Sequence, residues 1–217
     1  MNHYLESAEG IKSKLVEWRR AIHENPEVGL DLPKTVSLVE RELRAMGYQP
    51  QPCGGGVVAV LEGDMPGKTM LLRADMDALP MREESGLPFA SKVDNAAHTC
   101  GHDTHTAMLL GAALLLMENK NRIKGRIKLM FQPGEEVGKG ARAMIDAGLL
   151  ENPAVDAVVG LHAMVAAGLD SGKIGWYKGP ALASADIFRI DATGKGTHGS
   201  RPETGVDPIN ILCHIQN

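Results

Sequence analysis

The sequence lacks any apolar run long enough to cross a lipid bilayer. Its longest such stretch, TAMLLGAALLLM at residues 106–117, has twelve residues, whereas a membrane-spanning helix needs about 20. The first twenty residues are charged and amphipathic, without the apolar centre of a secretion signal. We therefore expect no membrane partner and a cytoplasmic location.

Cysteines and clusters of basic residues are also scarce. Cys53, Cys100 and Cys213 are odd in number and widely spaced, which argues against a disulfide framework and leaves metal binding or catalysis as roles. The net charge is −4 and the basic residues are dispersed, so we expect no nucleic-acid partner. With 217 residues, 43% of them hydrophobic, the chain is an ordinary globular protein with a sizeable core.

Helix and strand patterns alternate through most of the chain. Apolar residues at helical spacing predict four helices, at residues 11–25, 35–48, 104–119 and 141–150. Short apolar runs bounded by turn residues predict four strands, at residues 56–63, 69–77, 125–133 and 157–163. This alternation is typical of an α/β fold with a mostly parallel sheet flanked by helices. Polar motifs follow the strand ends, where such sheets bind ligands.

A different pattern begins a second domain, expected over residues 181–217. Residues 183–202 alternate apolar and polar side chains, which predicts a half-exposed antiparallel strand. Residues 205–217 predict a helix in which Asp207 caps the N-terminus and Pro208 occupies the first turn.

The segment HTCGHDTHTA concentrates possible ligands at a helix start. Residues two apart share a side only in an extended segment, so Cys100 and His102 can bind one metal only before the helix begins. Thiolate and imidazole suit zinc and its neighbours, but a buried cysteine beside a surface histidine explains this pair equally well. We predict that Asp103 caps the helix rather than binding metal. His98 and His105 are expected to form hydrogen bonds behind the ligands.

Two adjacent acids follow a predicted strand and a Pro-Gly turn. Glu135 and Glu136 can diverge there, one toward a metal and the other toward a reacting water. A metallohydrolase needs that division of roles. Acids near a helix start also satisfy the helix dipole, so this motif alone leaves both explanations open.

Three further polar residues stand at strand ends. A single histidine such as His162, at the end of a buried strand, is more simply explained as a core residue. Asp75 and Asp77 point the same way from their strand end, and capping explains one of them more easily than both. A possible ligand follows one strand end after another, and this repeated order is stronger evidence for a metal site than any single motif.

At this point the chain resembles the metal-dependent amidohydrolases that include hippurate hydrolases, bacterial N-acyl-amino-acid amidohydrolases and plant indole-acetyl-amino-acid hydrolases. That group belongs to the wider aminoacylase and carboxypeptidase superfamily of metallopeptidases. The resemblance implies a zinc-peptidase-like catalytic domain, of which residues 1–180 form the N-terminal part, and the start of a smaller α+β lid or dimerisation domain at residues 181–217. It rests on segments that occur in the family's order: LVEWRRAIHENPEVGLDLPKT, LRADMDALPMREESGLPFAS, HTCGHDTHTAMLLGAA, FQPGEEVGKGARAMIDAGLL, VVGLH and GKGTHGSRPETGVDP.

The resemblance also implies a metal centre with a defined division of roles. Cys100, His102, Glu136 and His162 fall on the positions that bind the family's two divalent metal ions. Glu135 falls on the general base, which takes a proton from water and later delivers it to the leaving amine. The metal is expected to be manganese or zinc, with cobalt and nickel also compatible with these ligands.

Other site residues are implied in the same way. Asp77 resembles the carboxylate that orients a metal ligand, and Asp75 stands where related peptidases carry a metal-binding histidine. His198 resembles the lid histidine that enters the partner subunit's active site, contacts the substrate and helps to stabilise the oxyanion.

The implied reaction is metal-dependent hydrolysis of the amide bond in hippurate-like or N-acetylated amino acids, which releases a carboxylate and a free amino acid. Its partner is this small-molecule substrate, and the full-length protein is expected to form a homodimer or larger homo-oligomer. The alternatives are a dipeptidase or carboxypeptidase-like activity and a noncatalytic truncated chain. A Cys-His nucleophilic hydrolase is disfavoured, because the acids around Cys100 suit a cation better.

The chain departs from the family's pattern in two respects. After His162 the family commonly continues with an aromatic residue and a proline, whereas this chain reads AMVAAGLDSG, which leaves the acyl preference open. Family members also run on to complete the lid and to supply a final metal-binding histidine. His214 is a poor substitute because it lies in the predicted lid helix. We therefore expect a fragment of a longer product or a truncated relic.

Overall fold

A computed structural model describes residues 3–164, 170–180, 184 and 186–216. Backbone contacts divide the chain into two compact units, residues 1–165 and 166–217. This division lies before the change of pattern that the sequence places after residue 180. The assignment of the second unit to a lid stays a prediction. No helix among the described residues is both long and apolar enough to cross a membrane.

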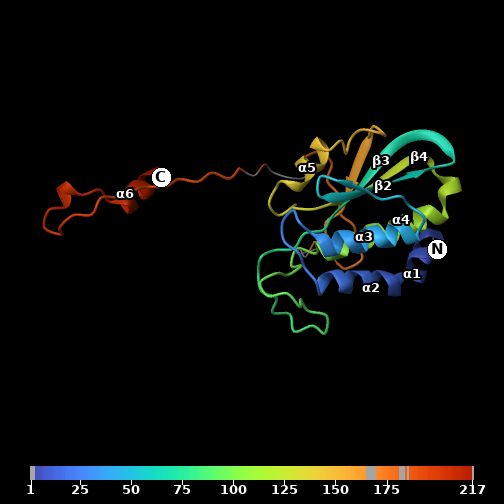
Figure 1. Ribbon diagram of the computed structural model, residues 1–217, viewed down its shortest axis with the longest axis horizontal. Helices are drawn as coiled ribbons and strands as arrows, with labels where there is room; N and C mark the ends of the chain where they lie inside the picture. The colour runs from blue at the N-terminus through green and yellow to red at the C-terminus, as the bar shows by residue number, and fades with distance from the viewer. Residues whose placement is uncertain (1–2, 165–169, 181–183, 185, 217) are drawn as a thin grey trace. The chain divides into compact units, whose positions relative to one another are not determined.

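The first unit is built on one five-stranded sheet (Figure 1). Its strands lie in the order β1-β2-β4-β3-β5. β3 pairs in parallel with β4 and β5, whereas β2 pairs antiparallel with β1 and β4. The strand bounds are β1 Gln51–Cys53, β2 Gly56–Glu62, β3 Met65–Asp75, β4 Lys124–Gln132 and β5 Ala157–Gly160.

The α/β class is confirmed, but the sheet is mixed rather than mostly parallel. The reason is local, because Gly54 and Gly55 join β1 to β2 with positive φ angles, as a tight hairpin requires. Only two residues separate β2 from β3, so the chain reverses there too, whereas a parallel connection needs a long crossover. Such a crossover, containing a helix, leads from β3 to β4.

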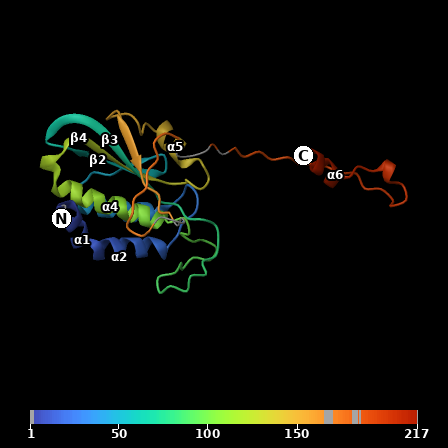
Figure 2. The ribbon, with the colours of Figure 1, turned by 180° about the vertical axis from the view of Figure 1, so that it is seen from behind.

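The helices cover the sheet unequally. α3 and α4 pack on one face, and α2 lies against the outer side of α4 (Figure 2). α5 packs on the opposite face. Helix α1 and strand β1 were not expected from the sequence. The helix bounds are α1 His3–Gly10, α2 Lys12–His23, α3 Pro33–Ala45, α4 His102–Glu118, α5 Gly140–Asp146 and α6 Pro208–Gln216, with 3-10 turns at Lys120–Arg122 and Pro202–Thr204.

The main core fixes α4 against the sheet. Leu43 of α3, Leu110 of α4 and Phe131 of β4 are completely buried in one hydrophobic cluster. Each such side chain contributes about 1.5–3 kcal/mol through burial. A smaller cluster on the other face includes Met130 and Met144. The start of α4 is thereby held beside the carboxyl end of β3.

Parallel pairing brings the chemical motifs together. Asp75 at the end of β3 is in register with Gln132 at the end of β4, and Arg73 is in register with Gly160 at the end of β5. The carboxyl ends of three strands therefore lie at one edge of the sheet, where ligands bind in folds of this class.

The second unit contains α6 and an isolated bridge between Lys195 and Val206. Asp207 caps α6 as predicted, because its Oδ1 accepts the amide protons of Ile209 and Asn210 at 2.9 and 3.3 Å.

The strand expected within residues 183–202 is wrong for the part of it that is described. Residues 186–193 form no strand ladder, and residues 183 and 185 lie outside the described chain. Ile187 and Phe188 are 100% and 82% exposed. An alternating pattern forms a strand only where a neighbouring strand supplies the hydrogen bonds and a packed face.

Candidate metal centre

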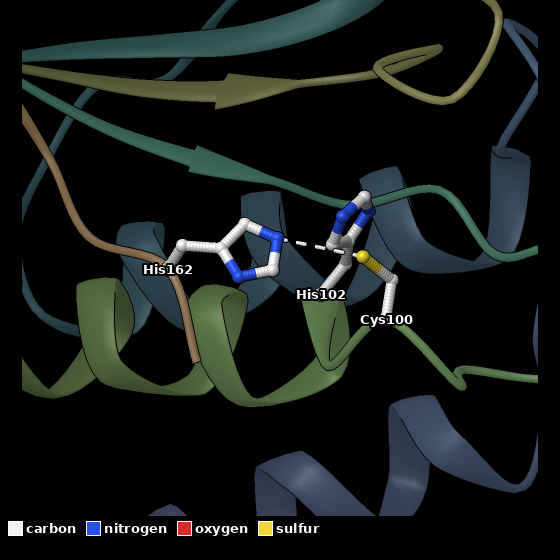
Figure 3. Close-up of side chains that lie close together, drawn as sticks. All are labelled: Cys100, His102 and His162. Carbon is white, nitrogen blue, oxygen red and sulfur yellow. Dashed lines mark hydrogen bonds between the residues drawn. The ribbon is translucent and has the colours of Figure 1, made fainter. Parts of the chain in front are cut away.

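The turn before α4 places two possible ligands side by side. Gly101 has a φ of 89°, a left-handed conformation that favours glycine, and α4 begins at His102. Cys100 therefore lies outside the helix, as the Cys-x-His spacing requires. The ligand atoms of Cys100, His102 and His162 all lie within 4.8 Å of one another (Figure 3). The Cys100 Sγ is 3.4 Å from the His162 Nε2.

The surroundings of His102 favour positive charge at its Nε2 atom. Its Nδ1 lies 2.9 Å from the main-chain oxygen of Asp77 and donates a proton there. Nε2 faces Glu136 Oε1 at 3.7 Å and Glu135 Oε2 at 3.8 Å. Burial opposes a charged ring, but Asp77 and the nearby carboxylates raise the pKa of His102 above its ordinary value. A cation bound at Nε2 would be stabilised by the same carboxylates that stabilise a proton there.

Asp77 holds the loop that carries the two glutamates. Its carboxylate accepts the main-chain N–H of Glu135 at 3.0 Å and of Glu136 at 3.1 Å. Because these bonds use the main chain, both glutamate side chains stay available. α5 begins only at Gly140 and has no acid in its first turn, so the helix-dipole explanation of the two acids is wrong.

Cys100 does not have the environment of a nucleophile. Burial, followed by the neighbouring Glu136 carboxylate, raises the pKa of the Cys100 thiol to about 12. Reactive cysteines instead sit in electropositive sites that lower the thiol pKa. The acids that surround this sulfur suit a cation.

Two unsatisfied polar atoms test whether the residues fit a metal. His102 Nε2 and Glu136 Oε1 are buried and have no hydrogen-bond partner among the described residues. Leaving such atoms unpaired costs about 1–3 kcal/mol each. They face one another beside a thiol and a second imidazole, and this mixture of sulfur, nitrogen and oxygen donors suits a divalent transition metal. The residues present therefore fit a metal centre.

His162 is not a core histidine. The residue is exposed and follows β5, the edge strand of the sheet. A strand end at the edge of a sheet leaves its side chain free to face a neighbouring loop, and His162 faces Cys100. The simpler explanation offered by the sequence is therefore wrong.

Asp75 and His105 lie behind the possible ligands. Asp75 Oδ1 is 2.6 Å from His105 Nδ1, and its Oδ2 is 2.7 Å from Arg73 Nη1. Burial opposes ionisation most strongly, but the bond from His105 and the charge of Arg73 keep the pKa of Asp75 below its ordinary value. His105 thus forms the kind of hydrogen bond that the sequence predicts for it.

Asp103 does not cap α4, because its carboxylate points away from the helix start toward α2. It accepts hydrogen bonds from Arg19 Nε at 2.6 Å and from His23 Nδ1 at 2.7 Å. The N-cap position belongs to Gly101. The predicted cap is therefore replaced by a buried ionic network between α2 and α4.

His98 forms no hydrogen bond in the described structure. Both of its ring nitrogens are buried and unpartnered, and burial lowers the pKa of His98 to about 4. Its predicted hydrogen-bonding role is thus not observed.

The network predicts a pH-dependent contribution to stability. The bond to Asp103 outweighs burial and raises the pKa of His23 above 6.5, so its contribution is fully present below pH 6.5 and is lost as pH rises through the folded pKa. Burial raises the pKa of Asp103, but the hydrogen bond from His23 and the nearby positive charges outweigh it and hold the pKa below 3.8. The contribution of Asp103 to stability is therefore present above pH 3.8. We expect His23→Gln to lower the free energy of unfolding by about 1.5–3 kcal/mol at pH 5.5 and by less at pH 9.

Urea denaturation of the metal-free chain at the two pH values measures this difference. The exposed His3 gives a matched control, His3→Gln, which should change stability little at either pH. An equal loss for His23→Gln at pH 5.5 and pH 9 would contradict the prediction.

His198 belongs to the second unit. Its Nδ1 lies 2.8 Å from Ser200 Oγ, in the exposed turn before the 3-10 segment. Its predicted role in a partner's active site stays a prediction.

The sequence that defines this arrangement belongs to a known family. The pattern of Peptidase family M20/M25/M40 matches residues 71–204, which include every proposed ligand. The chain belongs to this family. Among the curated relatives of this chain, thermostable carboxypeptidase 2 of Saccharolobus solfataricus is 46% identical over 212 residues, covering 95% of this chain and 53% of the relative. Hippurate hydrolase of Campylobacter jejuni is 46% identical over 202 residues, covering 92% and 51%.

Solved structures agree with the fold. The Bacillus subtilis YXEP protein, described as a dinuclear metal binding peptidase of this family, matches with a TM-score of 0.69 and 38% identity, over 72% of this chain and 44% of that one. A Staphylococcus aureus protein matches with a TM-score of 0.80 and 32% identity, over 99% and 57%. The chain spans about half the length of the curated relatives it matches.

Proposed function

We propose that the protein hydrolyses the amide bond of N-acyl-amino acids with the help of two divalent metal ions. One observation carries the proposal. His102 Nε2 and Glu136 Oε1 are buried, face one another without hydrogen-bond partners among the described residues, and lie beside Cys100 and His162. Relatives named hippurate hydrolase and N-acyl-L-amino acid amidohydrolase support the substrate class at 46% and 41% identity.

Cys100, His102, Glu136 and His162 would hold the metal. A divalent cation in such a site polarises a carbonyl and lowers the pKa of water. The ligands supply two imidazoles, of which that of His102 is fixed as the Nδ1-protonated tautomer by Asp77, and two groups that carry negative charge when bound. Manganese and zinc are the proposed ions, with cobalt and nickel compatible with the same donors.

Glu135 would move the proton. Its side chain is 39% exposed, and its Oε2 is 3.8 Å from His102 Nε2, so the carboxylate borders the proposed centre and stays accessible to water. A general base acts within hydrogen-bond reach of its proton or through one water. Glu135 would take a proton from the attacking water and deliver it to the amide nitrogen as the C–N bond breaks. The products are a carboxylate and a free amino acid.

The proposal assigns roles to Asp77 and His198 and a location to the protein. Asp77 would orient His102 and the glutamate loop through its three hydrogen bonds. His198 would contact the substrate in a homodimer of the full-length protein and help to stabilise the oxyanion. A cytoplasmic location is part of the proposal, because a reducing compartment protects a thiol ligand from oxidation.

Metal removal gives the direct test. We expect the reconstituted chain to retain manganese or zinc after dialysis and to release amino acids from N-acetyl- and N-benzoyl-amino acids. EDTA should abolish release and the ion should restore it, because the centre supplies water activation. Metal content and amino-acid release are measured on the same samples. Failure to retain any ion, or release that resists EDTA, would overturn the proposal.

A carboxypeptidase activity is the second candidate, because a thermostable carboxypeptidase is as similar to this chain as the hippurate hydrolase is. Both activities cleave an amide next to a free carboxylate. Dipeptides and N-acyl-amino acids with the same C-terminal residue distinguish them. Faster cleavage of the free dipeptide would favour this candidate.

A further inference from the structure

The segment that carries His162, residues 161–164, makes few hydrogen bonds to the rest of the described chain. Sheet pairing of β5 ends at Gly160, opposite Arg73. Within the described residues 161–164, one main-chain hydrogen bond connects the segment to another element: the Ala163 N–H donates to His105 Nε2 at 2.7 Å. Because Ala163 adjoins His162, this bond sets where the His162 main chain lies.

His105 is itself fixed from the opposite side. Its Nε2 accepts the Ala163 proton, so its own proton resides on Nδ1, where it is donated to Asp75 Oδ1 at 2.6 Å. The side chains of His105 and Asp75 are 1% and 0% exposed. Thr106 Oγ1 also donates to the Asp75 main-chain oxygen at 2.8 Å. The imidazole therefore has one tautomer and a defined position.

We propose that Asp75 and His105 form a positioning pair that holds Ala163, and through it the His162 imidazole, within reach of Cys100 and His102. The centroids of the His105 and His162 rings lie 4.8 Å apart, with an angle of 68° between the ring planes, so His105 also packs directly against His162. The pair contributes no ligand in this scheme. Its contribution to the metal centre rests on the proposed function, whereas its contribution to the position of Ala163 does not.

Two substitutions separate the hydrogen bonds of His105. The amide of asparagine reaches about as far as Nδ1 and that of glutamine about as far as Nε2. His105→Asn therefore keeps a donor toward Asp75 and removes the acceptor for Ala163, whereas His105→Gln keeps that acceptor. Thr106→Val is the matched control, because it removes a buried hydrogen bond to Asp75 from the next residue of α4 without touching Ala163.

The first measurement is amide hydrogen exchange at Ala163 in the metal-free chain. We expect His105→Asn to speed this exchange about tenfold or more, and His105→Gln and Thr106→Val to leave it near the wild-type rate. The second measurement is the affinity for zinc or manganese, which should fall about 10–100-fold in His105→Asn and recover in His105→Gln.

The outcomes decide the proposal separately from the proposed function. Unchanged Ala163 exchange in His105→Asn would overturn the positioning pair, as would equal effects in His105→Asn and Thr106→Val. A wild-type chain that binds no divalent ion would overturn the proposed function, and the exchange comparison on metal-free protein would still decide the role of His105. Faster exchange with unchanged metal affinity would remove the link between the pair and the metal centre.

Discussion

Replacing Glu135 by alanine should leave metal binding intact and reduce amino-acid release by about 10²–10⁴-fold, the range that a positioned general acid and base contributes. The side chain of Glu135 is the more exposed of the two adjacent glutamates, at 39% against 21%. Its structural contribution is its main-chain N–H, which donates to Asp77. Alanine preserves that bond, so the loop should keep its shape.

The measurement is kcat/KM for N-benzoyl- and N-acetyl-amino acids, with the metal content of each sample determined in parallel. Glu135→Gln keeps the size of the side chain and should lose the same activity, because an amide cannot carry the proton. Glu118→Ala, at the exposed end of α4, is the control. Loss of metal from Glu135→Ala would show instead that this residue is a ligand.

Local patterns were sufficient to predict part of the arrangement of this candidate site. The spacing of Cys100 and His102 allows both to bind one metal only if Cys100 lies before the helix, and α4 indeed begins at His102. A Pro-Gly turn after a buried strand likewise predicts that the loop of Glu135 and Glu136 faces the carboxyl edge of the sheet. These inferences needed only the periodicity of neighbouring residues and the rule that ligands gather at strand ends.

The parts that could not be predicted depend on residues far apart in the chain. Asp103 carries the residue type and position of a helix cap, yet it bonds to His23, eighty residues earlier. Arg19 and His23 have the helical spacing of any solvated face and give no local signal of that partner. The mixed sheet was missed because β2 is buried along most of its length, a pattern typical of a parallel strand, yet it pairs antiparallel with β1 and with the distant β4.

The second prediction concerns Glu136, which should show opposite effects in the metal-free and metal-loaded protein. Its buried Oε1 has no hydrogen-bond partner among the described residues, and the acid opposes ionisation of Cys100. Removing the side chain removes the cost of leaving this buried oxygen unpaired, so metal-free Glu136→Ala should be as stable as wild type or more stable by about 1 kcal/mol. A purely structural glutamate would instead destabilise the metal-free protein when removed.

In the metal-loaded protein, wild type should be more stable than Glu136→Ala. Loss of a direct ligand should weaken binding by more than about 100-fold, beyond the 10–100-fold that loss of an outer hydrogen bond costs. Wild type at a metal concentration of 100 Kd gains about 2.7 kcal/mol, and Glu136→Ala should gain little at the same concentration. Thermal unfolding of both proteins with and without zinc or manganese measures both signs, with Glu135→Ala as the variant that retains the metal-dependent gain. Equal gains in Glu136→Ala and wild type would remove Glu136 from the ligand set, because a carboxylate that contributes to binding must contribute to the stability that binding confers.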